Sequence, residues 1–145
     1  MKQNSIFALL FFAVISINSS CKKDDDPTPA SCPMTVASIA NTFKLTSLKF
    51  KPSGGTESEI INSLNACQRD DLLVLNANKS FTYQDAGVIC APNGSYAGDW
   101  DVTGSNLRIE TEMSILTSWD CTNLVFYVNN KPSAGDRMTY TYTKQ

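Results

Sequence analysis

Hydrophobic and polar residues alternate along most of the chain from about residue 42 to its end. The clearest run is 137–143, where Met138, Tyr140 and Tyr142 alternate with three threonines. A period of two is typical of a strand with one buried and one solvated face. Turn residues, mostly Asn and Gly, separate the runs. The pattern predicts eight strands, over residues 42–51, 71–76, 80–85, 95–102, 106–112, 114–119, 122–129 and 137–143.

Two of these runs carry further information. In the first run Phe43 and Leu48 fall on opposite parities, which predicts a β-bulge near Ser47. Residues 72–75 are continuously apolar, which predicts a strand covered on both sides.

One short helix is expected between the first two strands. Thr56 and Glu59 form a capping box, in which Thr56 is the N-cap and Glu59 reaches back to its backbone. Ile60, Ile61 and Leu64 follow at helical spacing and form a small apolar face. We expect this face to lie on the 72–75 strand or to plug one end of the sheet.

Eight short antiparallel strands joined by tight turns favour closure into an up-and-down barrel, because closure removes exposed strand edges. We therefore expect an all-β fold, a small eight-stranded antiparallel barrel with one short helix. Strand parity places these side chains inside: Phe43, Leu45, Phe81, Tyr83, Trp100, Leu107, Ile109, Phe126, Met138, Tyr140 and Tyr142. It places these side chains in solvent: Thr82, Asp99, Asp101, Arg108, Glu110, Thr139 and Thr141.

Residues 1–20 have the composition of an export signal. Lys2 precedes an uncharged run over 6–17, which as a helix would rise about 18 Å and fall short of a bilayer core of roughly 30 Å. Ser19, Ser20 and Cys21 then resemble the end of a bacterial lipoprotein signal, whose cysteine becomes the acylated first residue. We expect a lipid anchor on Cys21; an ordinary secretory signal with an unrelated cysteine is the alternative.

The cysteine count supports acylation. An exported protein is expected to pair its cysteines, and there are five, so that one would be left over. With lipid on Cys21, four remain for two disulfides. Cys67 and Cys90 flank a predicted hairpin that brings its ends together, and Cys32 and Cys121 follow by elimination.

A charged, proline-containing tether follows the first cysteine. It includes Lys22, Lys23, three aspartates and two prolines, and no large apolar side chain. This gives three parts: a signal peptide over 1–20, a lipidated cysteine and flexible acidic tether over 21–33, and a barrel domain over 34–145. Lys followed by several Asp after the cysteine also resembles the surface-export signal of Bacteroidetes lipoproteins, so we expect the cell surface rather than the periplasmic face.

Composition excludes several classes of function. The chain has no histidine, which removes Ser-His-Asp triads, HExxH zinc sites and histidine bases. The net charge of -2 argues against nucleic-acid binding. No phosphate loop or nucleophile elbow is present. We expect no enzyme activity, no cofactor and no metal.

The acidic pairs are weak candidates for chemistry. Asp70 and Asp71 are neighbours, so on a strand they would point to opposite faces and mark a strand entry rather than a catalytic pair. Asp99 and Asp101 share a face, as do Glu110 and Glu112. A solvated outer wall is the expectation for both pairs, with a weak calcium site as the alternative.

The order of several short motifs resembles the lipocalin-like domain of Bacteroidetes lipoproteins, over about residues 40–145. The motifs are Cys67-Gln68-Arg69-Asp70-Asp71, Asn78-Lys79-Ser80-Phe81, Cys90, Gly98-Asp99-Trp100 and Asn106-Leu107-Arg108-Ile109. The resemblance implies a barrel and an outer-membrane location, without an assigned ligand.

The aromatic residues are the best candidates for a binding site. If the barrel holds a small apolar or amphipathic ligand, Trp100, Tyr83, Tyr140 and Tyr142 are the expected lining. A barrel of eight strands is only just wide enough for its own side chains, so a filled core is the alternative. A rival function is a non-enzymatic interaction module of a surface complex, for example in glycan capture. An exposed aromatic patch on the outer wall would favour this rival.

Overall fold

The computed structural model describes residues 32–145, and the predicted signal peptide, Cys21 and most of the tether lie outside them. The elements are α1 (Val36–Ile39), β1 (Thr42–Lys51), β2 (Ser58–Glu59), the 3-10 turn η1 (Ile61–Ser63), α2 (Ala66–Arg69), β3 (Leu72–Leu75), β4 (Ser80–Gln84), β5 (Tyr96–Thr103), β6 (Asn106–Ile109), β7 (Glu112–Trp119), β8 (Asn123–Asn129) and β9 (Arg137–Lys144).

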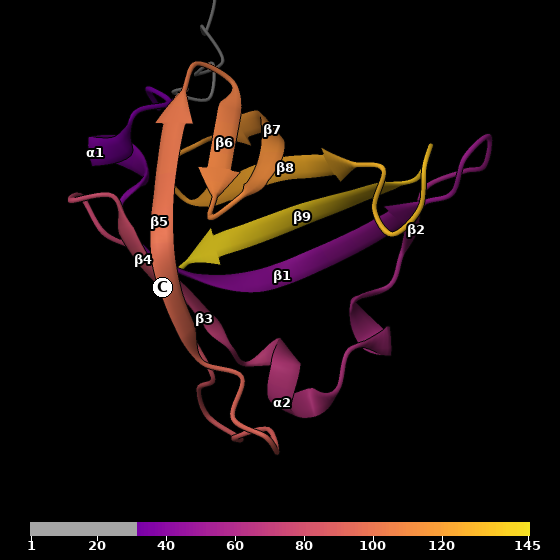
Figure 1. The fold of residues 1–145 in the computed structure, drawn as a ribbon, viewed down its shortest axis with the longest axis horizontal. Coiled ribbons are helices and arrows are strands. Elements are labelled where there is room, and N and C mark those ends of the chain that lie inside the picture. The colour runs from indigo at the N-terminus through magenta and orange to yellow at the C-terminus, as the bar shows by residue number, and fades with distance from the viewer. Residues whose placement is uncertain (1–31) are drawn as a thin grey trace, which may run out of the picture.

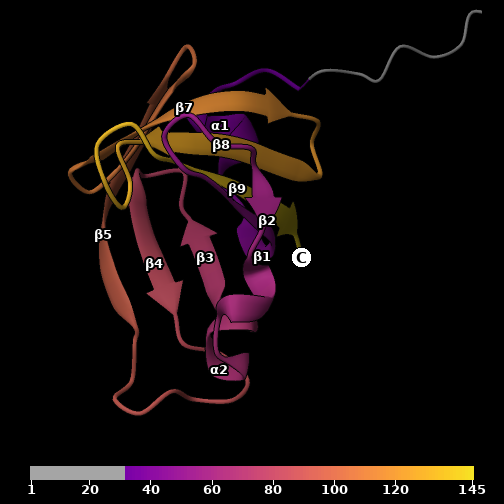
Figure 2. The ribbon, with the colours of Figure 1, turned by 90° about the vertical axis from the view of Figure 1, so that its right-hand side faces the viewer.

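The strands form one closed antiparallel ring. From β3 to β9 each strand pairs with the next in sequence, and β1 pairs with both β3 and β9. The two-residue β2 pairs with β1 at Lys49 and Phe50, beyond the residues of β1 that pair with β3. Strands β1, β8 and β9 cross β3, β4 and β5 at a steep angle (Figures 1 and 2). The expected eight-stranded all-β barrel is confirmed.

The bulge in β1 is where the sequence predicts it. The register of β1 against β9 shifts between Leu45 and Ser47, so that Thr46 has no partner. Phe43 and Leu48 are both buried although they lie on opposite parities. The extra residue therefore turns the second half of β1 to face the barrel interior.

The expected helix after Thr56 does not form, and this correction has a physical reason. The Glu59 carboxylate accepts hydrogen bonds from the backbone N–H groups of Leu48 and Ile61, at 2.9 and 3.0 Å, and from the Ser47 hydroxyl. Glu59 thus lies in β2, and its carboxylate bonds to residues of β1 instead of capping the N-terminus of a helix. Between β2 and β3 the chain forms two short helices, η1 and α2, and α2 contains Cys67.

Two further expectations need correction. The expected strand 106–112 is split after Ile109, where Glu110 adopts a positive φ of 53°, and Glu112 opens β7. In β3, Leu73 and Leu75 are buried while Leu72 and Val74 are only half-buried, so the apolar run is not covered equally on both sides.

The filled part of the core lies at the end of the barrel near α1. Its fully buried side chains are Ile39, Phe43, Leu75, Phe81, Trp100, Leu107 and Leu124. The indole N–H of Trp119 donates to the Ser38 hydroxyl at 2.8 Å, and its ring meets Phe43 edge to face. We call the end of the barrel near α1 the closed end.

The predicted inward side chains divide into two groups. Phe43, Phe81, Trp100, Leu107, Phe126 and Tyr142 are buried, while Leu45, Tyr83, Ile109, Met138 and Tyr140 are half-buried. Among the predicted outward residues, Asp99 and Glu110 are exposed. The other five are half-buried rather than fully solvated: Thr82, Asp101, Arg108, Thr139 and Thr141.

Candidate functional site

The interior of the barrel is not filled at the end opposite α1. A cavity of about 380 Å³ opens there, within the size range of small-molecule sites. Its apolar lining consists of Leu45, Leu48, Leu64, Leu73, Ile109, Phe126 and Met138. Its polar lining consists of Tyr83, Tyr96, Tyr140, Tyr142, Ser114, Glu112 and Lys131. The sequence left a filled core and an open cavity as alternatives, and the barrel contains both. The closed end is filled, and the end with the cavity, which we call the open end, is hollow.

The path of β1 explains why this end stays open. Only Thr42–Lys44 of β1 pair with β3, and beyond the bulge β1 continues along β9 alone until β2 joins it. The chain spans the gap between β1 and β3 with η1 and α2, which bring Leu64 to the cavity wall. Side chains of Leu45 and Leu48 therefore face a space that no strand closes.

Three of the four predicted binding residues line this cavity. Tyr83, Tyr140 and Tyr142 come from β4 and β9, and their rings lie against other aromatic rings. Tyr140 and Tyr142 stack on Phe126 with ring centroids 5.2 and 5.9 Å away, and Tyr83 stacks on Tyr96 at 5.3 Å. Stacked aromatic pairs of this kind stabilise the packing of the wall beyond the apolar area they bury.

The tyrosine hydroxyls keep their protons under all ordinary conditions. Burial raises the pKa of Tyr142 and of Tyr140. Burial also raises the pKa of Tyr83, and a hydrogen bond to the buried Asp71 carboxylate adds to the effect. Neutral phenols on an apolar wall provide hydrogen-bond donors without placing a charge inside the barrel.

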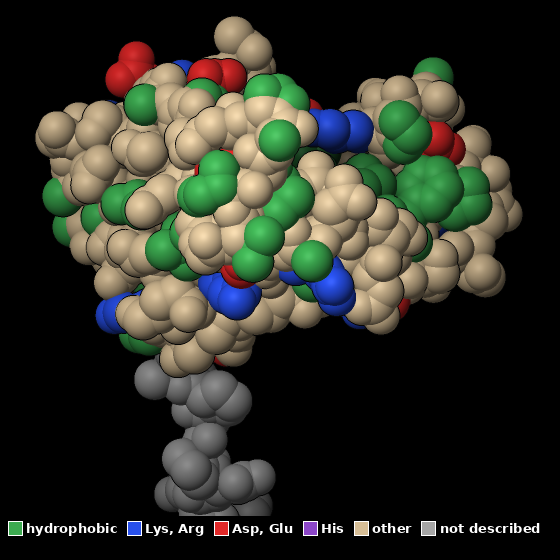
Figure 3. Space-filling model, turned by 90° about the horizontal axis from the view of Figure 1, so that it is seen from below, with side chains coloured by type: hydrophobic (Ala, Val, Ile, Leu, Met, Phe, Trp, Pro, Cys, Tyr) green, Lys and Arg blue, Asp and Glu red, His purple; other side chains and the backbone are tan. Residues whose placement is uncertain are grey.

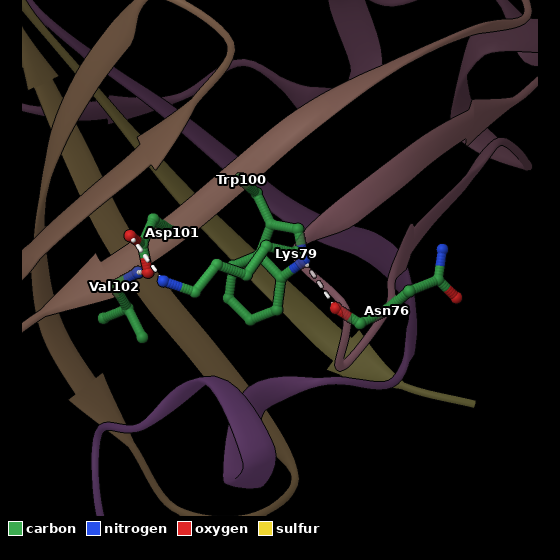
Figure 4. A network of polar contacts seen from close by, with 5 residues as sticks. All are labelled: Asn76, Lys79, Trp100, Asp101 and Val102. Carbon is green, nitrogen blue, oxygen red and sulfur yellow. Dashed lines mark hydrogen bonds and ion pairs between the residues drawn. The ribbon is translucent and has the colours of Figure 1, made fainter.

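Trp100, the fourth predicted binding residue, does not line the cavity. Its side chain is 0% exposed and belongs to the filled core. The indole N–H donates to the carbonyl of Asn76 at 2.9 Å, and beside it Lys79 pairs with Asp101 at 3.0 Å (Figure 4). The parity of the strand correctly predicts that Trp100 points into the barrel. Parity does not say how far along the barrel axis a side chain lies, and Trp100 lies in the filled part.

An ion pair lies at the mouth of the cavity. The Lys131 ammonium, in the loop between β8 and β9, contacts both carboxylate oxygens of Glu112, at 2.7 and 2.9 Å. Tyr140 lines the same cavity. Burial lowers the pKa of Lys131, but the hydrogen bond and charge of Glu112 outweigh it and leave that pKa raised. Because its pKa is raised, Lys131 stays protonated and places a positive charge at the cavity mouth.

Two features of this site were missed from the sequence. Tyr96 shares the parity of Trp100, yet its half-exposed ring lies at the mouth rather than in the core. Lys131 lies in the β8–β9 loop and Glu112 is the first residue of β7, 19 residues earlier, and no local pattern relates them. In Figure 3, hydrophobic side chains gather on the face seen from below, with a basic side chain beside a hollow in that face.

The acidic pairs do not form a metal site among residues 32–145. Asp101 is paired with Lys79, Glu112 with Lys131, and no group of three metal-ligating side chains occurs there. Asp99 and Glu110 are exposed, which agrees with the solvated-wall interpretation, whereas Glu112 lies at the cavity mouth.

Asp70 and Asp71 hold the long loop between β4 and β5. Asp70 accepts from the N–H of Val88 at 2.8 Å, and Asp71 accepts from that of Ala86 at 3.3 Å. Their predicted place at a strand entry is correct, and their carboxylates cap backbone groups.

A disulfide joins the same loop to α2. Cys67 and Cys90 are bridged, with Cα atoms 5.3 Å apart, and the buried Asp85 carboxylate accepts from the N–H groups of Cys90 and Gly94. The predicted pairing is confirmed. The loop carries two exposed apolar side chains, Val88 and Ile89.

The second disulfide ties the start of the described chain to the barrel. Cys32 is bridged to Cys121 with Cα atoms 5.5 Å apart, and its N–H donates to the Trp119 carbonyl at 3.2 Å. This pairing is also as predicted. The chain thus enters the fold at the closed end, whereas α2 and the β4–β5 loop lie at the opposite side of the molecule (Figure 1).

No helix described in residues 32–145 is long and apolar enough to cross a membrane. Comparison of the chain with models of protein families, with curated proteins and with solved structures finds no match.

Proposed function

We propose that this protein is a lipid-anchored outer-membrane lipoprotein whose lipocalin-like barrel binds a small apolar or amphipathic molecule. The anchor is the acylated Cys21, and the acidic tether favours display on the cell surface. The binding site is the cavity at the open end of the barrel. No enzymatic step is part of this function.

The observation that carries the proposal is the cavity itself. A barrel that served only as a solid spacer would gain stability by filling its interior, since empty apolar space destabilises a fold. Here seven apolar side chains and four tyrosines surround about 380 Å³ of open space. An apolar wall with a few fixed polar groups is the usual composition of a small-molecule site.

The position of the tether agrees with this function. The described chain begins at Cys32, which the disulfide to Cys121 holds at the closed end. A barrel anchored through this end leaves its cavity mouth accessible from the side away from the anchor.

The rival function, an interaction module, has less support. It calls for an exposed aromatic patch on the outer wall. The exposed large hydrophobic side chains within residues 32–145 are Val88, Ile89, Tyr96 and Met113. Tyr96 is the one aromatic residue in this set, and it belongs to the cavity lining.

A dye-binding experiment tests the proposal. The full chain with Cys21→Ser, which removes the predicted acylation site, is titrated with an apolar dye that fluoresces when shielded from water. Leu45→Trp should fill the cavity and abolish dye binding, because Leu45 faces the open space. Val88→Trp is the matched control, since Val88 is exposed on a loop outside the cavity lining. A wild-type barrel that binds no dye, or a Leu45→Trp variant that binds as well as the control, would refute the proposal.

A further inference from the structure

We propose that the ligand of this cavity is an amphiphile with an anionic head group, whose negative charge replaces the Glu112 carboxylate on Lys131. This inference rests on the proposed function and adds the charge and the orientation of the ligand. The head group lies at the cavity mouth, and the apolar tail lies among Leu45, Leu73, Phe126 and Met138.

The first argument is the charge of the lining. Lys131 is the one cationic side chain among the residues that surround the cavity. Its ammonium contacts Glu112, and Tyr140 lines the same cavity. An anion on Lys131 would bind a cationic donor, and the neutral phenols of the lining offer further donors.

The second argument is the geometry of Glu112. Both oxygens of its carboxylate contact the Lys131 ammonium, at 2.7 and 2.9 Å. The protein itself thereby demonstrates that a carboxylate fits at Lys131 with two contacts. We interpret Glu112 as an internal stand-in that occupies the position of the ligand head group when the cavity is empty.

The third argument is the ease of exchange. The side chains of Lys131 and Glu112 are 42% and 44% exposed, and ion pairs of such exposure contribute little to stability. Glu112 follows the turn after Ile109, at the rim, so its carboxylate can rotate into water. Exchange of one carboxylate for another therefore leaves the barrel intact.

An anion is favoured over a cation by where the two charged residues lie. Lys131 is half-buried, whereas Glu112 is exposed at the start of β7. An anionic head group on Lys131 leaves the exposed Glu112 carboxylate to water and keeps a partner on the half-buried ammonium. A cationic head group on Glu112 would leave that ammonium without a partner.

The test compares three probes with the same twelve-carbon tail: dodecanoate, dodecanol and dodecylammonium. Each displaces the apolar dye from the full chain with Cys21→Ser, at pH 8 and below the concentration at which micelles form. We expect dodecanoate to bind about fivefold tighter than dodecanol, a difference of about 1 kcal/mol. Dodecylammonium should bind more weakly than dodecanol.

Three variants assign this preference to the mouth. Lys131→Met should remove the advantage of dodecanoate over dodecanol while dodecanol binding stays within about twofold of wild type, since a twofold change is under half a kcal/mol. Glu112→Gln should strengthen dodecanoate binding, because the internal competitor is gone. Lys51→Met is the matched control, because Lys51 does not line this cavity and its loss should leave the ranking unchanged. Thermal unfolding of each variant confirms that the barrel is folded.

The outcomes separate this inference from the proposed function. Binding of all three probes with equal affinity, or tightest binding of dodecylammonium, would overturn the anionic head group and leave the apolar site standing. Unchanged preference for dodecanoate in Lys131→Met would also overturn it. Failure of all three probes and the dye to bind would refute the proposed function itself.

Discussion

The indole of Trp100 and the backbone carbonyl of Asn76 are joined by a hydrogen bond of 2.9 Å inside the barrel. The bond links β5 to the turn between β3 and β4, at the edge of the buried core. Because the Trp100 side chain is 0% exposed, its volume and its N–H group are both needed there.

Replacing Trp100 by Ala should therefore lower the free energy of unfolding by about 3–5 kcal/mol, since it leaves a large cavity in the closed end. Trp100→Phe keeps more of the volume and removes one of the two hydrogen bonds that the Asn76 carbonyl accepts, the other coming from the Lys79 N–H at 3.0 Å. The lost hydrogen bond should cost about 0.5–1.5 kcal/mol. Denaturant titration measures both. Dye affinity of Trp100→Phe should equal that of wild type, because Trp100 is not part of the cavity lining; a clear loss of dye binding would contradict this separation.

The two disulfides should differ in their contribution to stability. The bridged residues Cys67 and Cys90 are 23 positions apart, and Cys32 and Cys121 are 89 apart. On the chain-entropy model, loss of the shorter loop costs about 3 kcal/mol and loss of the longer one about 4.5 kcal/mol. Paired Cys→Ser variants, compared by urea unfolding, check the order. Equal losses would show that strain or denatured-state structure outweighs loop length.

Glu59 should make stability depend on pH. Burial raises its pKa, but hydrogen bonds from Ser47 and from the N–H groups of Leu48 and Ile61 outweigh this, so the folded pKa lies below the ordinary value of 4.5. A carboxyl with a lowered folded pKa stabilises the protein above the unfolded pKa, and this contribution is lost as the pH falls through the folded pKa. Wild type should lose stability below about pH 4.5, the region where carboxyl groups titrate.

The matched variant is Glu59→Gln, which cannot ionise. Its free energy of unfolding should be lower than that of wild type at pH 7, and the difference should shrink toward pH 3. Unfolding curves at both pH values measure the effect. A constant difference across this range would mean that the charge of Glu59 is not what holds β2 to β1.

Acylation of Cys21 predicts that Cys21→Ser releases the protein from the membrane fraction of a host that processes lipoproteins. Ser20→Ala is a suitable control, because a small residue is retained before the cysteine. Intact-mass analysis of the wild type should show a lipid-modified Cys21 as the first residue. Membrane association of Cys21→Ser, together with an unmodified wild type, would refute the anchor.

Local sequence patterns predicted most of the barrel because its strands obey them. The alternation of Met138, Tyr140 and Tyr142 places Tyr142 in the core, and the parity change before Leu48 marks the bulge. The capping box at Thr56 predicted a helix that does not form, because the Glu59 carboxylate bonds to residues of β1 that are distant in sequence. A local motif predicts a local hydrogen bond, and a tertiary one replaced it here.

The candidate site was predicted only in part, for a related reason. Periodicity identifies which side chains point inward, which gave Tyr83, Tyr140 and Tyr142. It does not give the height of each side chain in the barrel, so Trp100 was assigned to the cavity. The contact of Lys131 with Glu112 depends on where the β8–β9 loop meets the start of β7 after the ring has closed, and no spacing rule describes that contact.

The bridge between Cys32 and Cys121 also determines how the domain bears mechanical load. A pull on the chain before Cys32 is divided between α1 and the turn joining β7 to β8, because the disulfide connects directly to that turn. The segment between the two cysteines is a closed covalent loop, so tension cannot peel α1 and β1 away from the barrel one after the other. With the proposed anchor before Cys32, load would therefore reach the barrel through this covalent bridge rather than through α1 and β1 alone.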